Sequence, residues 1–206
     1  MFLVSTPGLL RKCFSKELIW NVDTEHKAVF LTFDDGPNPQ TTPVILEILD
    51  KLQVKATFFC IGKNCERYPL LFDSLNKSGH TIGNHTYSHL NGWKTHTNDY
   101  LCDIEKSNKI IASPLFRPPY GRIKPSQTKS LKKKYHIVMW SILSGDFDMN
   151  TSHEKCLQNA LRYTKPGSII VFHDSLKAIQ KVTTVLPEFI KRTLDQEFSF
   201  YPLISE

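Results

Sequence analysis

Two adjacent carboxylates at the end of an apolar run are the first group in the sequence that could do chemistry. Residues 28–36 read AVFLTFDDG, which places Asp34 and Asp35 directly after a run of β-forming residues. Carboxylates are costly to bury unless they are paired or bind a metal ion. The sequence therefore predicts either a turn aspartate before Gly-Pro or a neutralising partner for the acid pair.

Two histidines further along the chain could supply such a partner. His85 and His89 stand four residues apart in the stretch HTYSH, a spacing that puts both imidazoles on one side of a helical or turn segment. With one carboxylate they would make a three-ligand metal site that keeps open positions for water and substrate. Taken alone, the spacing also fits exposed or core histidines. No glutamate follows His85, so one member of the acid pair would have to act as the general base while the other binds the metal.

Three further polar residues follow predicted strands. His173 ends the apolar run 168–172 and could donate a proton to a leaving group. Asp146 could hydrogen-bond to His173 and keep it protonated. Arg117 could pair with a carboxylate and orient it. Each of the three also fits an ordinary structural role, as a histidine with satisfied partners, a loop aspartate and a surface arginine.

Strand-like and helix-like patterns alternate along the chain and predict the elements that must position these residues. Strands are expected at 29–33, 55–61, 80–84, 115–117, 136–142, 168–172 and 198–203. Helices are expected at 43–52, 68–75, 97–111, 126–134, 152–163 and 179–194, the last one broken or kinked at Pro187. Such alternation is typical of parallel strands joined by helices.

The residues suited to chemistry share one place in this pattern, the carboxyl end of a predicted strand. They are Asp34, Asp35, His85, Arg117, Asp146 and His173. In a (β/α) barrel these ends converge on one face, whereas a doubly wound open sheet concentrates function at one switch point. Because several strands contribute, we predict an α/β fold, an incomplete (β/α) barrel with about seven parallel strands.

Composition and charge narrow the class of protein. The 206 residues, 40% hydrophobic and 22% charged, fit one globular domain. The net charge is +6, and the lysine-rich run 129–134 contributes to it. That run is typical of a solvated helix face, because no aromatic residues alternate with the lysines as a base-stacking surface requires. A nucleic-acid partner is therefore not expected, and no long heptad pattern predicts an oligomer.

The cysteines and the N-terminus bear on location. Five cysteines without a CxxC spacing predict free thiols, most of them buried, in a reducing compartment rather than a disulfide framework. Residues 1–27 are expected to form a lead-in segment packed on the body, and their apolar runs are too short for a signal peptide. No later stretch is apolar enough to span a membrane. These features predict a cytoplasmic protein, and a cell-wall substrate would require export.

Together these stretches resemble the polysaccharide deacetylases of carbohydrate esterase family 4, whose NodB-homology domain carries a series of short motifs. The matching stretches, in family order, are 32–36 (TFDDG), 85–89 (HTYSH), 117–121 (RPPYG), 143–147 (LSGDF) and 171–173 (VFH). The resemblance implies that residues 28–206 form the catalytic domain and that its fold is a distorted (β/α) barrel.

The resemblance also implies acid–base roles. Asp34 would be the general base, positioned by Arg117. His173 would be the general acid, supported by Asp146.

The same resemblance implies a metal site and one wall of a substrate groove. Asp35, His85 and His89 would bind a divalent metal, with zinc expected and cobalt or nickel able to substitute. Pro119 and Tyr120 would form part of the groove, and the Tyr120 backbone would help to hold the oxyanion.

The fourth motif departs from the family pattern, which is often Asp-x-x-Asp-Trp. Leu143 replaces the first aspartate, and Phe147 replaces the tryptophan while remaining aromatic. Asp146 keeps the second aspartate. The departure bears on substrate preference and on the groove wall at Phe147, not on the acid–base groups.

The implied function is a metal-dependent hydrolase that removes acetyl groups from an acetylated carbohydrate. The expected substrate is a glycan that contains N-acetylglucosamine, such as peptidoglycan or a chitooligosaccharide, and O-acetyl esters lie within the same chemistry. One alternative is a hydrolase of another C–N bond, such as that of a cyclic imide or ureide. A second is a catalytically silent carbohydrate-binding protein, which predicts the loss of a ligand or acid–base group. None of these groups is missing from the sequence.

Overall fold

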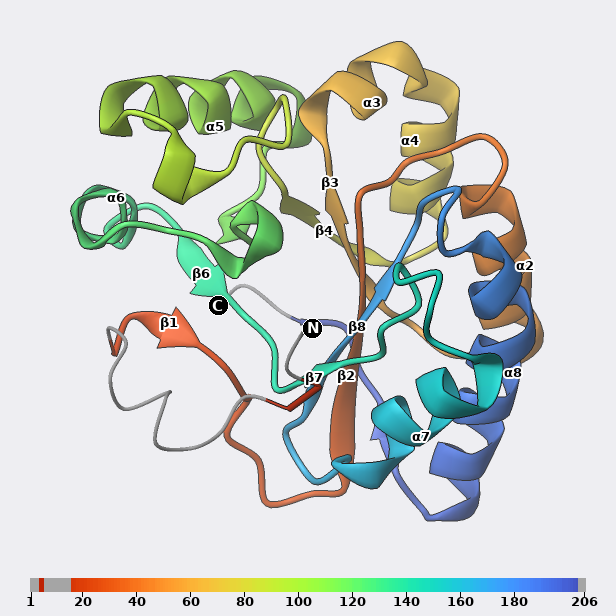
Figure 1. Cartoon of the computed structure of the whole chain (residues 1–206). Helices are drawn as coiled ribbons and strands as arrows, with labels where there is room; N and C mark the ends of the chain where they lie inside the picture. The colour runs from red at the N-terminus through yellow and green to blue at the C-terminus, as the bar shows by residue number, and fades with distance from the viewer. Residues whose placement is uncertain (1–3, 6–15, 204–206) are drawn as a thin grey trace.

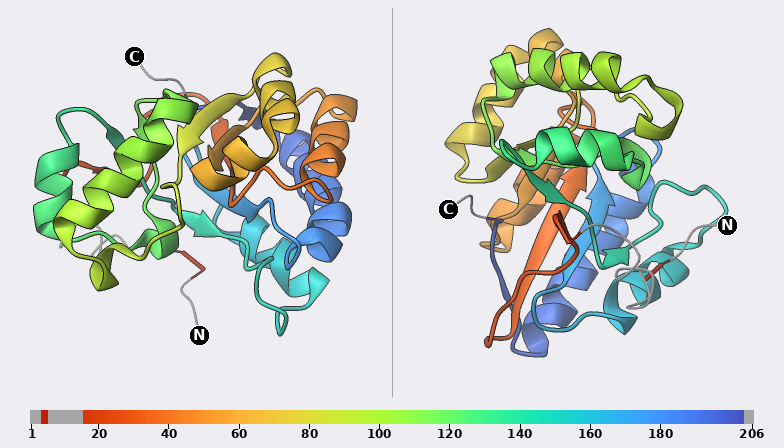
Figure 2. Two further views of the ribbon diagram at one scale, coloured as in Figure 1. Left: turned by 90° about the horizontal axis from the view of Figure 1, so that it is seen from above. Right: turned by 90° about the vertical axis from the view of Figure 1, so that its left-hand side faces the viewer.

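The computed structural model describes residues 4–5 and 16–203, which form an α/β fold (Figure 1). A curled sheet of parallel strands lies inside, and helices pack around its outer side (Figures 1 and 2). Cys13 and most of the expected lead-in segment before residue 16 lie outside the described residues. None of the helices in the described ranges is long and apolar enough to cross a membrane.

Nine strands pair in parallel within the described part of the chain. They are β1 (Leu18–Ile19), β2 (Ala28–Asp34), β3 (Thr57–Cys60), β4 (Thr81–Asn84), β5 (Leu115–Phe116), β6 (His136–Val138), β7 (Ile142–Leu143), β8 (Ile169–His173) and β9 (Ser199–Phe200). Their order in the sheet is β1-β6-β5-β4-β3-β2-β8-β7, and β9 pairs with β2 beside this path. The strands that follow one another in the chain from β2 to β6 are also neighbours in the sheet, as in a barrel.

Helices follow most of the strands. They are α2 (Thr42–Lys51), α3 (Gly62–Arg67), α4 (Pro69–Lys77), α5 (Thr97–Ile111), α6 (Pro125–Leu131), α7 (His153–Arg162) and α8 (Ile179–Asp195), with short 3₁₀ turns η1 (Gly92–Lys94) and η2 (Pro119–Gly121). All of the predicted helices are present, α5 with the predicted bounds and the others with bounds shifted by one to three residues, whereas α3 was not predicted. Of the break or kink expected at Pro187, the break is wrong, because α8 runs through this residue as one helix, with Leu186 and Phe189 buried.

The predicted incomplete (β/α) barrel is confirmed, but the predicted strand 136–142 is wrong. This segment forms two strands, β6 and β7, that lie near opposite ends of the sheet. The Met139 N–H donates to the Ile19 carbonyl of β1 at 2.7 Å, and the Ser141 N–H donates to the Ile169 carbonyl of β8 at 3.0 Å. Between Met139 and Ser141 the chain therefore crosses the gap in the barrel, from β1 to β8. This crossing spans the open side of the barrel, although β6 and β7 do not pair.

Strand β2 is buried along its whole length and separates the two sides of the sheet. Val29, Leu31 and Phe33 pack in a core cluster with residues of α2 and α8. Thr32 and Asp34 lie on the other side, because side chains alternate along a strand. This alternation turns the Asp34 carboxylate toward the inside of the barrel. A charge that is buried there requires a partner.

Candidate active site

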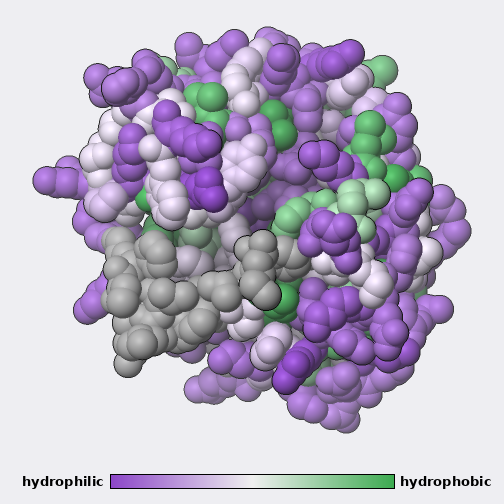
Figure 3. All heavy atoms as spheres, viewed as in Figure 1, coloured by the Kyte–Doolittle hydropathy of each residue, from purple (hydrophilic) through white to green (hydrophobic). Residues whose placement is uncertain are grey.

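The carboxyl ends of four neighbouring strands bring the predicted site residues together. In the register of β2 and β8, Asp34 pairs with His173. In the register of β3 and β4, Cys60 pairs with Asn84, which directly precedes His85. Because β3 also pairs with β2, these strand ends lie side by side. A space-filling view shows a hollow near the centre of the molecule in which hydrophilic residues gather (Figure 3).

Asp35, His85 and His89 form a compact cluster of possible metal ligands. The distance from Asp35 Oδ1 to His89 Nε2 is 3.2 Å, and that to His85 Nε2 is 3.7 Å. One ligand atom from each residue lies within 4.8 Å of the others. Two imidazoles and one carboxylate at this separation fit one divalent ion and leave positions open for other ligands.

The protonation state of His85 also suits a metal ligand. Its Nδ1 lies 2.8 Å from the Arg117 carbonyl, which can only accept, so Nδ1 carries the proton and Nε2 is free to face Asp35. Burial lowers the pKa of His85 to about 4, which keeps the ring neutral at neutral pH.

The backbone around the cluster is unusual. Asp35, Thr86 and His89 adopt positive φ angles of 79°, 64° and 56°. Residues other than glycine rarely adopt this left-handed conformation, and it persists where the surroundings impose it. Here the Asn84 side chain accepts from the Thr86 N–H, and the Asn64 side chain donates to the Asp35 carbonyl. These contacts fix the two segments that carry the candidate ligands.

Asp34 is paired with a fully buried arginine. Arg117 Nη1 donates to Asp34 Oδ1 at 2.7 Å and to Thr32 Oγ1 at 2.8 Å. The guanidinium also donates to the carbonyls of Val138 and Met139. With these four hydrogen bonds, Arg117 fixes the Asp34 carboxylate in one position beside the cluster of possible metal ligands.

His173 is held by Asp146 from two directions. Asp146 Oδ1 lies 2.8 Å from His173 Nδ1, and Asp146 Oδ2 accepts from the His173 N–H at 2.6 Å. Burial opposes protonation of His173, but the charge and hydrogen bond of Asp146, with smaller contributions from Asp35 and Asp34, raise its pKa to about 9. His173 is therefore protonated at neutral pH. The Phe147 ring meets the His173 ring edge-on at 5.0 Å between centroids.

Tyr120 borders the cluster on another side. Its ring lies 4.7 Å from the His89 ring, and 59% of the residue is exposed. Tyr120 has a positive φ of 62°, and its backbone N–H donates to no backbone acceptor among the described residues. Pro119 is buried directly before it. This N–H is consequently available to a ligand.

A buried carboxylate that the sequence analysis did not single out connects the loop after Asp35 to the end of β8. Asp174 follows His173 and accepts hydrogen bonds from the hydroxyls of Thr41 and Thr42, the latter at 2.5 Å. Its N–H donates to the Asp34 carbonyl at 2.7 Å, and a Cβ on Gly36 would overlap its carboxylate. The only signal in the sequence is an acidic residue directly after a buried strand.

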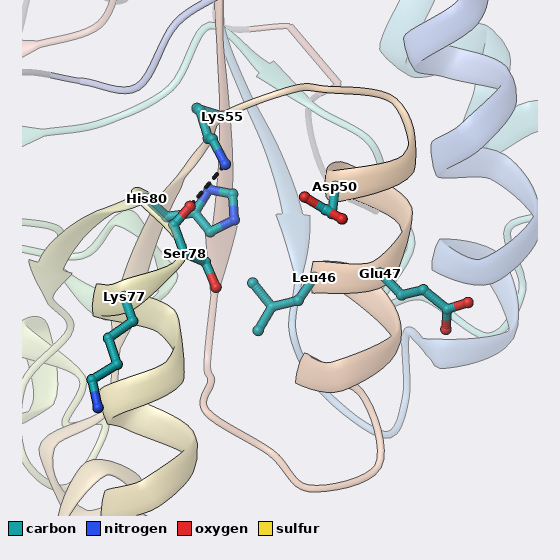
Figure 4. Close-up of a pocket in the computed structure, with 7 residues that line it drawn as sticks. All are labelled: Leu46, Glu47, Asp50, Lys55, Lys77, Ser78 and His80. Atoms are coloured by element: carbon teal, nitrogen blue, oxygen red, sulfur yellow. Dashed lines mark hydrogen bonds between the residues drawn. The ribbon is translucent and has the colours of Figure 1, made fainter.

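A separate cavity of about 470 Å³ lies away from this cluster (Figure 4). It is lined by Leu46, Glu47, Asp50, Lys55, Lys77, Ser78 and His80. Lys55 and His80 precede β3 and β4, so the cavity is at the opposite ends of these strands from the metal cluster. The Ala56 N–H donates to His80 Nδ1 at 3.2 Å, and burial lowers the pKa of His80 to about 4. His80 is a structural histidine.

Comparisons with known proteins agree with the geometry. Residues 21–139 match the family model for polysaccharide deacetylase, and the chain belongs to this family. A peptidoglycan-N-acetylglucosamine deacetylase of Bacillus cereus is 40% identical over 154 residues, which are 71% of this chain and 56% of that protein. The chain thus spans little more than half the length of this relative.

Solved structures show the same fold. The crystal structure of the Bc1960 peptidoglycan N-acetylglucosamine deacetylase matches with a TM-score of 0.88 and 32% identity, over 96% of this chain and 95% of that one. BA3943, described as a pseudoenzyme of family CE4 from Bacillus anthracis, matches with a TM-score of 0.82 and 24% identity, over 93% and 69%. A protein with this fold can therefore lack activity, and function must be argued from the site residues.

Proposed function

We propose that this protein is a metal-dependent deacetylase that hydrolyses the N-acetyl group of N-acetylglucosamine residues in peptidoglycan. The observation that carries the proposal is the Asp35–His85–His89 cluster, with Asp34 and His173 beside it on paired strand positions. The activity named for the Bacillus cereus relative and for Bc1960 supports the choice of substrate.

Asp35, His85 and His89 would hold the metal, and their mixed nitrogen and oxygen donors suit zinc, with cobalt or nickel as substitutes. When bound, such an ion supplies Lewis acidity that polarises the acetyl carbonyl and lowers the pKa of a water molecule. The Tyr120 N–H would donate to the carbonyl oxygen as negative charge develops on it.

Asp34 and His173 would divide the proton transfers. Asp34, held by Arg117, accepts a proton from the attacking water. His173 Nδ1 donates to Asp146, which leaves Nε2 to give its proton to the departing amine nitrogen. The raised pKa of His173 suits an acid that must be charged before it acts.

The decisive test of the base is Asp34→Asn. The variant should retain bound metal and lose acetate release from peptidoglycan and chitooligosaccharides, because the amide cannot accept the proton. Glu188→Gln on the surface of α8 serves as a control and should release acetate at the wild-type rate. Near-normal turnover by Asp34→Asn would contradict the assignment.

The alternatives give different results in the same assay. A hydrolase of cyclic imides or ureides would open such rings and release no acetate from glycans. A silent carbohydrate-binding protein would bind glycan and release no acetate in the presence of any metal. The second alternative is disfavoured because the metal cluster and both acid–base pairs are complete in this chain.

A further inference from the structure

Trp93 is a large aromatic residue that is both exposed and held in place close to the candidate active site. It belongs to η1, four residues after His89, and 54% of it is exposed. Its Nε1 donates to the Ile123 carbonyl at 3.1 Å, and the Asn91 side chain accepts from its backbone N–H. The indole thus presents surface to solvent in a fixed orientation, which lowers the entropy lost when a ligand packs on it.

A chain of contacts through the segment 120–123 links Trp93 to the cluster of Asp35, His85 and His89. The segment between β4 and α5 that carries Trp93 lies beside the segment between β5 and α6 that carries Tyr120 and Arg122 (Figure 1). Gly92 approaches Arg122 so closely that a Cβ on Gly92 would overlap the Arg122 carbonyl. The Tyr120 ring in turn lies 4.7 Å from the His89 ring, tilted by 59°. The exposed residues Trp93 and Tyr120 therefore lie on neighbouring segments, and Tyr120 contacts the cluster through His89.

A positively charged side chain lies beside this aromatic surface. The Arg122 guanidinium lies 5.3 Å from the centre of the Trp93 ring. Arg122 is exposed and makes no ion pair with a described carboxylate, unlike Arg117 and Arg192. A guanidinium without a counterion beside an aromatic plane favours a ligand that combines an apolar face with a negative charge.

We propose that Trp93 and Arg122 form a subsite for a sugar ring that carries a carboxylate and flanks the ring whose acetyl group is hydrolysed. The C–H groups on one face of a pyranose would pack on the indole, and the carboxylate would accept from Arg122. The inference rests on the proposed function and names the substrate class as an anionic glycan. The lactyl carboxylate of a muramic acid residue whose stem peptide has been removed has this chemistry, whereas chitooligosaccharides are neutral.

Binding can be measured without turnover in an Asp34→Asn background. Two ligands are titrated by calorimetry, a tetrasaccharide of alternating N-acetylglucosamine and N-acetylmuramic acid and the neutral N-acetylglucosamine tetramer. Adding Arg122→Met should weaken binding of the anionic tetramer about tenfold and that of the neutral one less than twofold. Adding Trp93→Ala should weaken both, about tenfold, while Trp93→Phe keeps part of the affinity.

Arg162 and Tyr163 provide a matched control. The Arg162 guanidinium lies 5.4 Å from the exposed Tyr163 ring, in the same kind of pair, but at the end of α7 that leads to the start of β8. Arg162→Met and Tyr163→Ala should leave both affinities unchanged.

The subsite is overturned if Arg122→Met affects the two tetramers equally, or if Trp93→Ala affects neither. Failure of the proposed function gives a different result. The wild type would then release no acetate from any glycan, while the titrations would still show the expected differences.

Discussion

Asp34 and His173 are register partners on the adjacent parallel strands β2 and β8. The two side chains therefore start from backbone positions one strand spacing apart and emerge on the same face of the sheet. Each is tied to its own buried partner, Arg117 for Asp34 and Asp146 for His173. The candidate base and acid are thus placed by the sheet itself, and the loops are left to supply the metal ligands and the groove.

Replacing Arg117 with methionine should destabilise the fold and abolish activity. Asp34 is 4% exposed, and loss of its partner leaves a buried carboxylate uncompensated. Breaking a buried ion pair in this way typically costs about 3–5 kcal/mol. Urea denaturation of Arg117→Met against the wild type measures the cost.

The surface pair of Arg192 with Glu188 gives the control for this prediction. Arg192→Met should cost less than about 1 kcal/mol, because exposed pairs contribute little. In the double variant Asp34→Asn/Arg117→Met, the cost of the arginine substitution should fall. Strictly additive costs would show that the pair is not coupled.

Replacing Asp146 with asparagine should move the alkaline limb of the pH–rate profile. With the pKa of His173 raised to about 9, wild-type activity should persist up to that pH and fall above it as the acid loses its proton. Asparagine removes the charge that raises this pKa while burial still lowers it, so the limb should shift to lower pH. The measurement is kcat/KM between pH 6 and 10.

Asp148→Asn is the control for the pH prediction, because Asp148 accepts from Asn150 and Thr151 rather than from His173. Its profile should match that of the wild type. An unchanged alkaline limb in Asp146→Asn would show that His173 does not set it.

Much of this architecture could be predicted, because short stretches of the sequence determine the strands and the polar residues that end them. The run that becomes β2 is apolar on both faces, and the acid pair ends it. The residues that were selected at strand ends, from Asp34 to His173, do lie together, because parallel strands bring their carboxyl ends to one edge. The chemical roles of these residues stay predictions until they are tested.

The features that the sequence did not reveal depend on contacts between distant segments. Residues 136–142 (HIVMWSI) read as one mostly apolar strand, and nothing in this stretch shows that the chain leaves β1 after Met139 and joins β8 at Ser141. The Thr42 hydroxyl donates to Asp174 across a separation of 132 residues, and no local pattern in the sequence relates these two residues.

Removal of metal should abolish activity and lower the melting temperature. An ion that binds only the folded state stabilises it, by about 2.7 kcal/mol at a concentration 100 times its Kd. After treatment with a chelator, added zinc should restore both the melting temperature and acetate release. Asp35→Asn should weaken zinc binding at least about 100-fold, since it removes the charged ligand.

Asp73→Asn is the matched control for the metal prediction, because Asp73 pairs with Lys77 on the surface of α4. It should bind zinc as the wild type does. Equal zinc affinity in Asp35→Asn and the wild type would place the metal elsewhere.

Replacing Thr42 with valine should reduce kcat while leaving metal content and KM nearly unchanged. The Thr42 hydroxyl donates to Asp174 and accepts from the Asn38 N–H at 2.7 Å, and so it joins the loop after Asp35 to the residue after His173. Valine leaves a partly buried N–H and a buried carboxylate oxygen without this partner, a loss of about 1–3 kcal/mol in stability. Thr42→Ser keeps the hydroxyl and should restore kcat. Thr183→Val, which removes a hydroxyl bonded only within α8, should change neither quantity, and a normal kcat in Thr42→Val would show that this contact does not position the site.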